Sequence, residues 1–149
     1  MRIVIQRVTR ASVSIEGRVE SAIEKGMMVL LGVGYADTDD DIDWLVKKTI
    51  NLRIFDDSEG VMNLSVKDVE GSILVVSQFT LMASCKKGNR PSYIHAASPD
   101  VSVPLYERFC QRLSAELGKP VSTGVFGADM QVELVNDGPV TIVIDSKDK

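Results

Sequence analysis

The sequence predicts a mixed α/β domain in layers, rich in β-sheet and with two main helices. Short apolar runs with many β-branched residues recur along the chain, and two longer segments carry apolar residues at helical spacing. No internal repeat and no Pro/Gly/Ser-rich linker divides the 149 residues. We therefore expect one domain over residues 1–149, with helices packed against a sheet.

The first part of the chain is predicted to be β-structure. Residues 3–5 form an apolar run, and residues 11–15 alternate between apolar and polar side chains. Glu16-Gly17-Arg18 is typical of a tight turn, so residues 10–24 are expected to form a hairpin. The continuous apolar run from Met27 to Val33 suits a strand that is buried on both faces.

The clearest helix lies near residues 39–50. Thr38 or Asp39 can cap it, and aspartates near its start with lysines near its end complement the helix dipole. Its apolar residues recur at i, i+3, i+4, i+7 and i+8, which places them on one stripe. They are Ile42, Leu45, Val46, Thr49 and Ile50.

A second helix is predicted to begin near Pro104 and to end at Gly118, with Pro120 just beyond it. Its apolar stripe contains Leu105, Phe109, Leu113 and Leu117. Further strands are expected at residues 52–55, 72–79, 130–136 and 140–145.

Composition limits the classes of function. Lys and Arg number 17 against 21 Asp and Glu, so nucleic-acid binding would need a local basic patch. Cys85 and Cys110 are too few for a disulfide framework or a zinc knuckle. No apolar run spans a bilayer and no signal peptide opens the chain, so we expect a soluble, cytoplasmic protein without membrane contact. We expect no metal and no cofactor.

Three familiar sites fail on their own chemistry. Asp37–Asp41 has the opening spacing of a calcium loop, but Ile42 stands where the loop needs glycine and Lys48 where it needs glutamate. Gly32-Val33-Gly34 continues into Asp37, a poor neighbour for a dinucleotide phosphate. His95 is the only histidine, so a catalytic triad would have to recruit it.

Three segments remain as candidate sites. Ser77-Gln78-Phe79-Thr80 closes an apolar run, either as a plain strand end or as a loop whose N–H groups face a developing oxyanion. Asn136–Thr141 contains a Gly-Pro step that is either a plain turn or the rim of a pocket. A basic loop follows the first segment, either as a solvated turn or facing a phosphate backbone. Its cations are Lys86, Lys87 and Arg90.

At these residues the chain resembles the D-aminoacyl-tRNA deacylases of the bacterial and eukaryotic type. The resemblance covers nearly the whole length, and the two motifs Ser77–Leu81 and Asn136–Thr141 are intact. Other matching segments are residues 6–8, 11–13, 31–33, 53–56, 62–64, 90–92 and 123–130. The resemblance implies a barrel-like sheet and a homodimer with active sites at the subunit interface.

The resemblance also implies roles for particular residues. The catalytic pocket would be built around Ser77, Gln78, Phe79 and Thr80. A cis Gly138–Pro139 peptide of one subunit would enter the pocket of the other, and Arg7 would hold that motif. Further substrate-binding residues implied are Asn136, Thr141, Phe126, Ala128 and Met130, while Lys86, Lys87 and Arg90 would contact tRNA.

The implied reaction is hydrolysis of the ester between a D-amino acid and the terminal adenosine of tRNA, extending to glycine mischarged on tRNA-Ala. Carbonyls of Gly138 and Pro139 would exclude L side chains. Thr80 could act as nucleophile, or the tRNA 2′-OH could assist a water while amides around Gln78 and Phe79 hold the oxyanion. A sibling activity on L-alanyl-tRNA and a non-catalytic nucleic-acid-binding module remain as alternatives.

Overall fold

The longest pairing in the structure joins the two ends of the chain. The computed structural model describes residues 1–149, and in it strand β1 (Arg2–Ile15) runs antiparallel to β8 (Gln131–Asp145) along almost its full length. On its other edge β1 pairs first with β3 (Gly26–Gly32) and then with β2 (Arg18–Ile23). One long strand therefore organises most of the sheet.

The sheet continues from β3 through parallel pairs. β6 (Ser72–Ser77) lies parallel to β3, and the short β7 (Ser122–Thr123) lies parallel to β6. The Ser21 hydroxyl of β2 donates to the Thr123 carbonyl of β7 at 2.7 Å, so the two ends of the strand order approach each other. The result is a nearly closed, barrel-like sheet.

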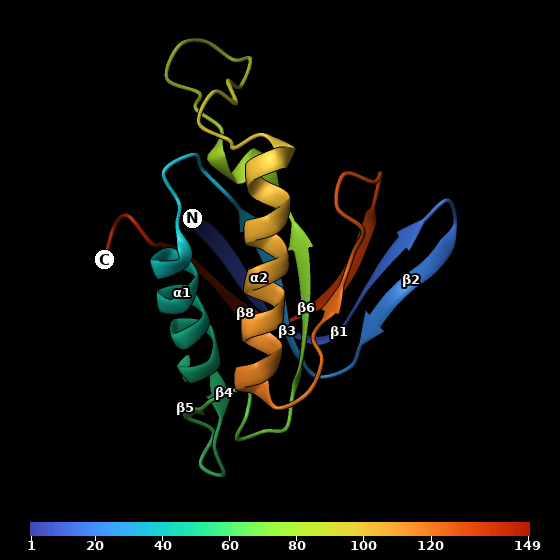
Figure 1. Ribbon diagram of the computed structural model, residues 1–149. Helices are drawn as coiled ribbons and strands as arrows, with labels where there is room; N and C mark the ends of the chain where they lie inside the picture. The colour runs from blue at the N-terminus through green and yellow to red at the C-terminus, as the bar shows by residue number, and fades with distance from the viewer.

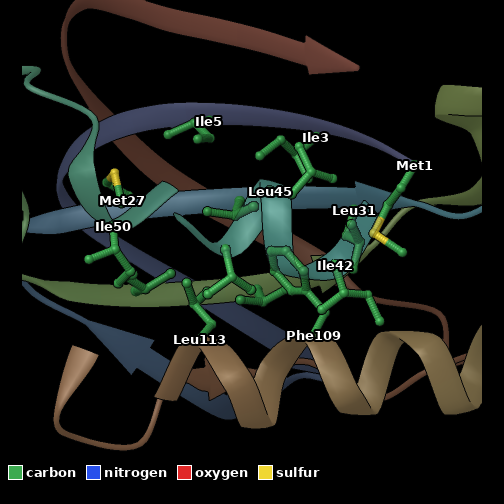
Figure 2. Packing of buried hydrophobic residues seen from close by; sticks show 14 of the residues in the cluster. Met1, Ile3, Ile5, Met27, Leu31, Ile42, Leu45, Ile50, Phe109 and Leu113 are labelled. Carbon is green, nitrogen blue, oxygen red and sulfur yellow. The ribbon is translucent and has the colours of Figure 1, made fainter. Parts of the chain in front are cut away.

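Both helices pack against one side of this sheet, side by side (Figure 1). They are α1 (Asp39–Asn51) and α2 (Pro99–Leu117). A core of 22 buried residues fills the space between helices and sheet, and it includes Leu45 of α1, Phe109 of α2, and Met27 and Leu31 of β3 (Figure 2). Side chains that point to the other face of the sheet, such as Met28 of β3 and Leu74 of β6, belong to a second cluster of seven buried residues. β3 is therefore buried on both faces, as its continuous apolar run predicts.

Several predicted elements are confirmed and others change in extent. The hairpin is β1–β2, and α1 begins after Thr38 as N-cap. The strands expected at 3–5 and 11–15 are one strand, and those expected at 130–136 and 140–145 are also one strand. The prediction of separate strands was wrong because polar residues interrupt each run, whereas backbone pairing between β1 and β8 continues across them.

The region expected to form strands at 52–55 and 72–79 is also rearranged. Residues 52–54 are not a strand; β4 (Phe55–Asp56) pairs with β5 (Met62–Leu64) in a small separate hairpin. β6 ends at Ser77, and a single 3₁₀ turn, η1 (Phe79–Met82), follows it.

The second helix begins five residues before the predicted start. Ser98 is the N-cap and Pro99 is the first helical residue, a position where a missing N–H has no cost. Pro104 lies inside the helix on its exposed side, where water can reach the carbonyl that loses its partner. The C-terminal end is as predicted, with Gly118 in the left-handed conformation at φ 83°. Neither helix has the length and apolar character to cross a membrane.

Candidate functional site

A cavity of about 330 Å³ opens where β6 ends. Its walls come from three places: the ends of β3 and β6, the first turns of α2, and the segment between β7 and β8. The lining residues are Leu31, Val33, Val76, Ser77, Gln78, Phe79, Ala97, Ser102, Tyr106, Phe126, Gly127, Ala128, Asp129, Met130 and Val132. This size lies within the range of small-molecule sites in proteins.

Parallel pairing explains why these distant segments meet. β7 pairs with Leu74 and Val75 of β6, so both strands end at the same edge of the sheet. Residues 77–79 leave β6 at that edge, and residues 126–130 leave β7 beside them. Two predicted groups, Ser77-Gln78-Phe79 and Phe126, Ala128 and Met130, therefore line one cavity.

The turn after β6 presents only some of its backbone N–H groups. The Gln78 N–H donates to the Leu31 carbonyl at 2.8 Å, so this amide already has an acceptor within the sheet. Phe79 and Thr80 begin the 3₁₀ turn η1, where the first N–H groups have no intrahelical acceptor. Of these two residues, Phe79 lines the cavity.

Arg2 and Gly32 fix the position of η1. The Arg2 guanidinium donates to the Leu81 carbonyl at 2.6 Å and is held by Asp145 at 2.8 Å. A Cβ at Gly32 would lie 3.0 Å from both the Gln78 carbonyl oxygen and the Leu81 Cβ, so glycine allows the turn to sit close to β3. The turn is thus tied to the first and last strands of the sheet.

The opposite wall is aromatic. The rings of Tyr106 and Phe126 meet edge to face with centroids 5.7 Å apart, and the Tyr106 hydroxyl donates to the Val75 carbonyl at 3.0 Å. Burial raises the pKa of the Tyr106 hydroxyl well above its usual range, so this group stays neutral. Tyr106 therefore lines the cavity with its ring and links α2 to β6 through its hydroxyl.

The cavity contains no acid–base pair suited to activating a nucleophile. Asp129 is the one carboxylate in its lining, and no His, Lys, Arg or Glu is present there. The Thr80 hydroxyl accepts a hydrogen bond from the Gln78 side-chain amide, and Thr80 is not among the lining residues. His95 lies on a different cavity beside Met1 and Asp37.

Neither cysteine contributes to the cavity. Cys85 is exposed on the loop after η1, and burial raises the pKa of the Cys110 thiol in α2 to about 11. No group of three or more His, Cys, Asp or Glu side chains is placed to hold a metal ion.

The Asn136–Thr141 motif forms a bulge in the middle of β8. Asn136 pairs with Val8 and Thr141 pairs with Gln6, so four residues of β8 stand opposite Arg7 alone. The motif is therefore a bulge within one strand and not a plain turn between two strands. The Gly138–Pro139 peptide is cis, and both residues are exposed.

Polar contacts from neighbouring strands and from within the bulge hold it at its base. Arg7, in the middle of β1, donates to the carbonyls of Asp137 at 2.8 Å and Ile54 at 2.7 Å. Its guanidinium also lies 3.2 Å from the Asp56 carboxylate. The Asn136 amide donates to the carbonyls of Arg7 at 2.9 Å and Val140 at 3.1 Å, and the Gln6 amide donates to the Thr141 hydroxyl at 3.2 Å.

Glycine is required at the top of the bulge. A Cβ on Gly138 would lie 2.1 Å from the Val140 nitrogen and 3.0 Å from the Asn136 side-chain oxygen. The first of these contacts is with backbone, so a side chain at this position would force the bulge to move.

The predicted site residues thus form separate groups within one chain. Ser77, Gln78, Phe79, Phe126, Ala128 and Met130 line the cavity. Asn136, Gly138, Pro139 and Thr141 form the bulge in β8, and Arg7 of β1 lies opposite it. No bulge residue lines the cavity. Lys86, Lys87 and Arg90 are exposed on the loop that follows η1, and none of them lines the cavity.

Sequence reasoning missed Asp129 and Tyr106 as parts of the cavity. Asp129 lies within residues 123–130, which resemble the family without a role being implied for Asp129. Tyr106 follows Leu105 in the second helix and was not among the residues predicted for its apolar stripe. The one signal in the sequence was the polar hydroxyl of Tyr106 next to the apolar stripe of this helix.

Comparisons with known proteins agree along the whole chain. The family model described as D-Tyr-tRNA(Tyr) deacylase matches residues 4–145. D-aminoacyl-tRNA deacylase of Bacteroides fragilis (strain YCH46) is 66% identical over 149 residues, which is 100% of this chain and 99% of the relative. That of Porphyromonas gingivalis (strain ATCC 33277) is 65% identical with the same coverage.

Two solved structures are also similar. One, described as c-Myc DNA Unwinding Element Binding Protein, has a TM-score of 0.91 and 43% identity, covering 97% of this chain and 98% of that chain. Another, described as a probable eukaryotic D-amino acid tRNA deacylase, has a TM-score of 0.82 at 20% identity, with 96% and 97% coverage, and shows a shared fold.

Proposed function

The chain belongs to the D-Tyr-tRNA(Tyr) deacylase family, and from that membership we propose that it hydrolyses the ester between a D-amino acid and the 3′-terminal adenosine of tRNA. The products are free D-amino acid and tRNA. One observation carries the proposal above others: the family match runs from residue 4 to residue 145 and so includes both cavity walls and the bulge.

The proposed mechanism needs little acid–base chemistry. An aminoacyl ester is an activated substrate, so positioning and stabilisation of the oxyanion can supply most of the rate. The N–H groups of Phe79 and Thr80 are the proposed oxyanion donors, because the Gln78 N–H is already bonded to Leu31. The tRNA 2′-OH assists the attacking water, since the cavity lining offers no general base near Thr80.

The proposed active unit is a homodimer. Gly138 and Pro139 are exposed and lie outside the cavity of their own chain. β8 is an edge strand, and Val132, Val135 and Val143 on it are 37%, 40% and 63% exposed. Pairing two copies would cover this apolar edge and would bring the bulge of one copy to the cavity of the other.

Substrate choice follows from that arrangement. Carbonyl oxygens of Gly138 and Pro139 from the second copy would meet the side chain of an L-amino acid and leave that of a D-amino acid free. Because glycine has no side chain, the same filter admits glycyl-tRNA, including glycine mischarged on tRNA-Ala. This is selection by exclusion, and it tolerates many D side chains.

The decisive assay compares D-tyrosyl-tRNA with L-tyrosyl-tRNA under identical conditions. We expect rapid loss of the D ester while the L ester survives. Equal hydrolysis of the two esters would contradict the exclusion filter, and activity confined to L-alanyl-tRNA would point to the sibling proofreading reaction. Sedimentation of the active protein at twice the chain mass of 16.3 kDa is expected.

DNA binding is a second candidate, because a solved structure 43% identical to this chain is described as c-Myc DNA Unwinding Element Binding Protein. The net charge of −4 disfavours it. A fluorescence anisotropy titration with duplex and single-stranded DNA at physiological salt separates the two functions. Submicromolar DNA affinity in a protein without deacylase activity would favour the second candidate.

A further inference from the structure

The segment between η1 and α2 forms a projecting arm. Ser84 and Ser92 exchange two backbone hydrogen bonds, of 2.8 Å and 2.9 Å, which close the base of a loop over residues 85–91. Gly88 in this loop has φ 87°, the conformation that lets the chain reverse. Figure 1 shows the arm extending beyond η1 and the start of α2. We call residues 83–97 the arm.

The arm begins and ends at the wall of the cavity. Its first stem follows directly from η1, which contains the lining residue Phe79, and its second stem ends at Ala97, another lining residue. Tyr93 on the second stem packs its ring against that of Phe79, edge to face, with centroids 5.0 Å apart. The base of the arm is therefore part of the cavity mouth.

The rings of Phe79 and Tyr93 are both accessible to solvent. Phe79 is 56% exposed and Tyr93 is 40% exposed. An edge-to-face pair uses the edge of one ring and one face of the other, so ring face remains available. Exposed aromatic rings beside a site are the usual platform on which the bases of single-stranded nucleic acid stack.

The arm also carries positive charge with no acidic residue beside it. Lys86, Lys87 and Arg90 are exposed and form no ion pair. Seven cations elsewhere are also without an ion pair, but each of them has an Asp or Glu within five residues in the sequence; they are Lys25, Lys47, Lys48, Arg53, Lys67, Lys119 and Lys149. Residues 83–99 contain no Asp or Glu. In a chain of net charge −4, this is a local site for a polyanion.

We propose that the arm binds the single-stranded 3′ end of the tRNA on the 5′ side of its terminal adenosine. Tyr93, supported by Phe79, stacks on a base preceding that adenosine. Lys86, Lys87 and Arg90 contact backbone phosphates of the nucleotides further to the 5′ side. This inference rests on the proposed function for the identity of the RNA. It adds a reason why a small cavity can be specific for an ester on a long RNA.

The first test measures binding alone, so it does not depend on hydrolysis. Deacylated tRNA and the same tRNA trimmed of its 3′-terminal CCA are titrated by anisotropy. We expect tighter binding of the intact tRNA by the unaltered protein. Tyr93→Ala should lose about tenfold in affinity for intact tRNA, the scale of one lost stacking contact, while Tyr93→Phe keeps it. Equal binding of both RNAs by the unaltered protein would overturn the inference.

Salt dependence tests the cations. In the triple variant K86A/K87A/R90A the slope of log affinity against log salt should fall by about 2, since each single-strand phosphate contact contributes about 0.7. The matched control is K25A/K67A/K119A. Lys25 directly precedes β3, Lys67 lies in the loop before β6, and Lys119 follows the end of α2, so all three are at the ends of these elements that do not form the cavity. An equal change of slope in both triple variants would show general electrostatics and would contradict a role for the arm.

Hydrolysis then separates this inference from the proposed function. Tyr93→Ala should lower kcat/KM for D-tyrosyl-tRNA about tenfold and leave kcat/KM for the minimal ester D-tyrosyl-adenosine unchanged. An equal loss on both esters would mean that Tyr93 only supports Phe79, and would overturn the inference. If the unaltered protein cleaves neither ester, the proposed function fails, and the binding measurements still decide whether the arm holds a tRNA end.

Discussion

Arg7 and Asn136 hold each other across the β1–β8 pair. The Asn136 side-chain amide donates to the Arg7 carbonyl at 2.9 Å, and the Arg7 guanidinium donates at 2.8 Å to the carbonyl of Asp137, the residue after Asn136. Because Asn136 also donates to Val140, it closes the bulge from the inside. The exposed Gly138–Pro139 peptide is thus mounted on a base of buried and half-buried polar contacts.

Removing the Asn136 donor should loosen this base. Asn136→Asp keeps the size of the side chain but turns a carboxylate toward two carbonyls, and we expect kcat/KM for D-tyrosyl-tRNA to fall about tenfold or more. Unfolding in urea should show a loss of about 1–3 kcal/mol, the cost of leaving such groups without partners. The matched control is Asn51→Asp, which removes an exposed amide bond to Lys47. Equal effects of the two substitutions would contradict a special role for Asn136.

Gly138→Ala should abolish activity while the fold survives. Its Cβ would lie 2.1 Å from a backbone nitrogen, so the bulge must shift, yet the residue is exposed and lies outside the core. Gly17→Ala is the control, because that turn has open space around it, and only its φ of 78° makes a side chain cost about 1 kcal/mol. Deacylation assays and circular dichroism measure the two effects. Full activity of Gly138→Ala would show that the bulge shape is not used.

Arg2 is expected to act on turnover by positioning η1. Arg2→Ala removes the donor to the Leu81 carbonyl, so the turn that carries Phe79 and Thr80 becomes looser and kcat should fall about tenfold, with KM little changed. Arg10→Ala is the control on the same strand, since Arg10 contacts only the exposed Glu133 carboxylate at 2.9 Å. A loss confined to thermal stability, with kcat intact, would argue against this role.

Thr80→Ala should retain substantial activity. The Thr80 hydroxyl accepts from the Gln78 amide and has no base beside it, so its removal leaves the backbone N–H donors in place. Single-turnover deacylation of D-tyrosyl-tRNA measures the effect, with Thr80→Ser as the conservative comparison. A loss greater than about a thousandfold, the scale of a lost nucleophile, would favour covalent catalysis by Thr80.

The buried Asp41 should make stability sensitive to acid. Burial alone would raise the pKa of Asp41, but hydrogen bonds from Lys147, Ser146 and the Thr38 N–H outweigh it and lower the pKa well below its usual range. A carboxyl group with a lowered folded pKa adds stability above its unfolded pKa of about 3.9 and loses it as the pH falls further.

Thermal unfolding across pH 2.5–7 tests this. The Tm difference between the unaltered protein and Asp41→Asn should be largest near neutral pH and should shrink as the pH falls below about 4. The control is Asp148→Asn, which alters an exposed carboxylate next to Lys147 near the end of the chain. Its Tm difference from the unaltered protein should stay small across this pH range. A Tm difference for Asp41→Asn that is constant over this range would contradict the assignment.

The sequence pattern was enough to predict those elements whose form depends on the residues of one segment. The apolar run of β3 and the stripe of α1 each reflect burial of one segment, so the pattern and the structure agree. The same holds for the end of α2 at Gly118, where only glycine takes φ 83° easily. The start of α2 was misplaced because Pro99 and Pro104 are both plausible first residues, and only the Ser98 cap distinguishes them.

By itself, the sequence determined the mixed α/β class, the two helices and the family, because motifs and periodicity are properties of neighbouring residues. Tertiary structure alone decided that β1 and β8 are each one continuous strand, since pairing between strands at opposite ends of the chain has no local signature. It also decided which motifs share a site. Parallel pairing of β6 with β7 brings residues 77–79 to residues 126–130, while no residue of the bulge at 136–141 lines the cavity of its own chain.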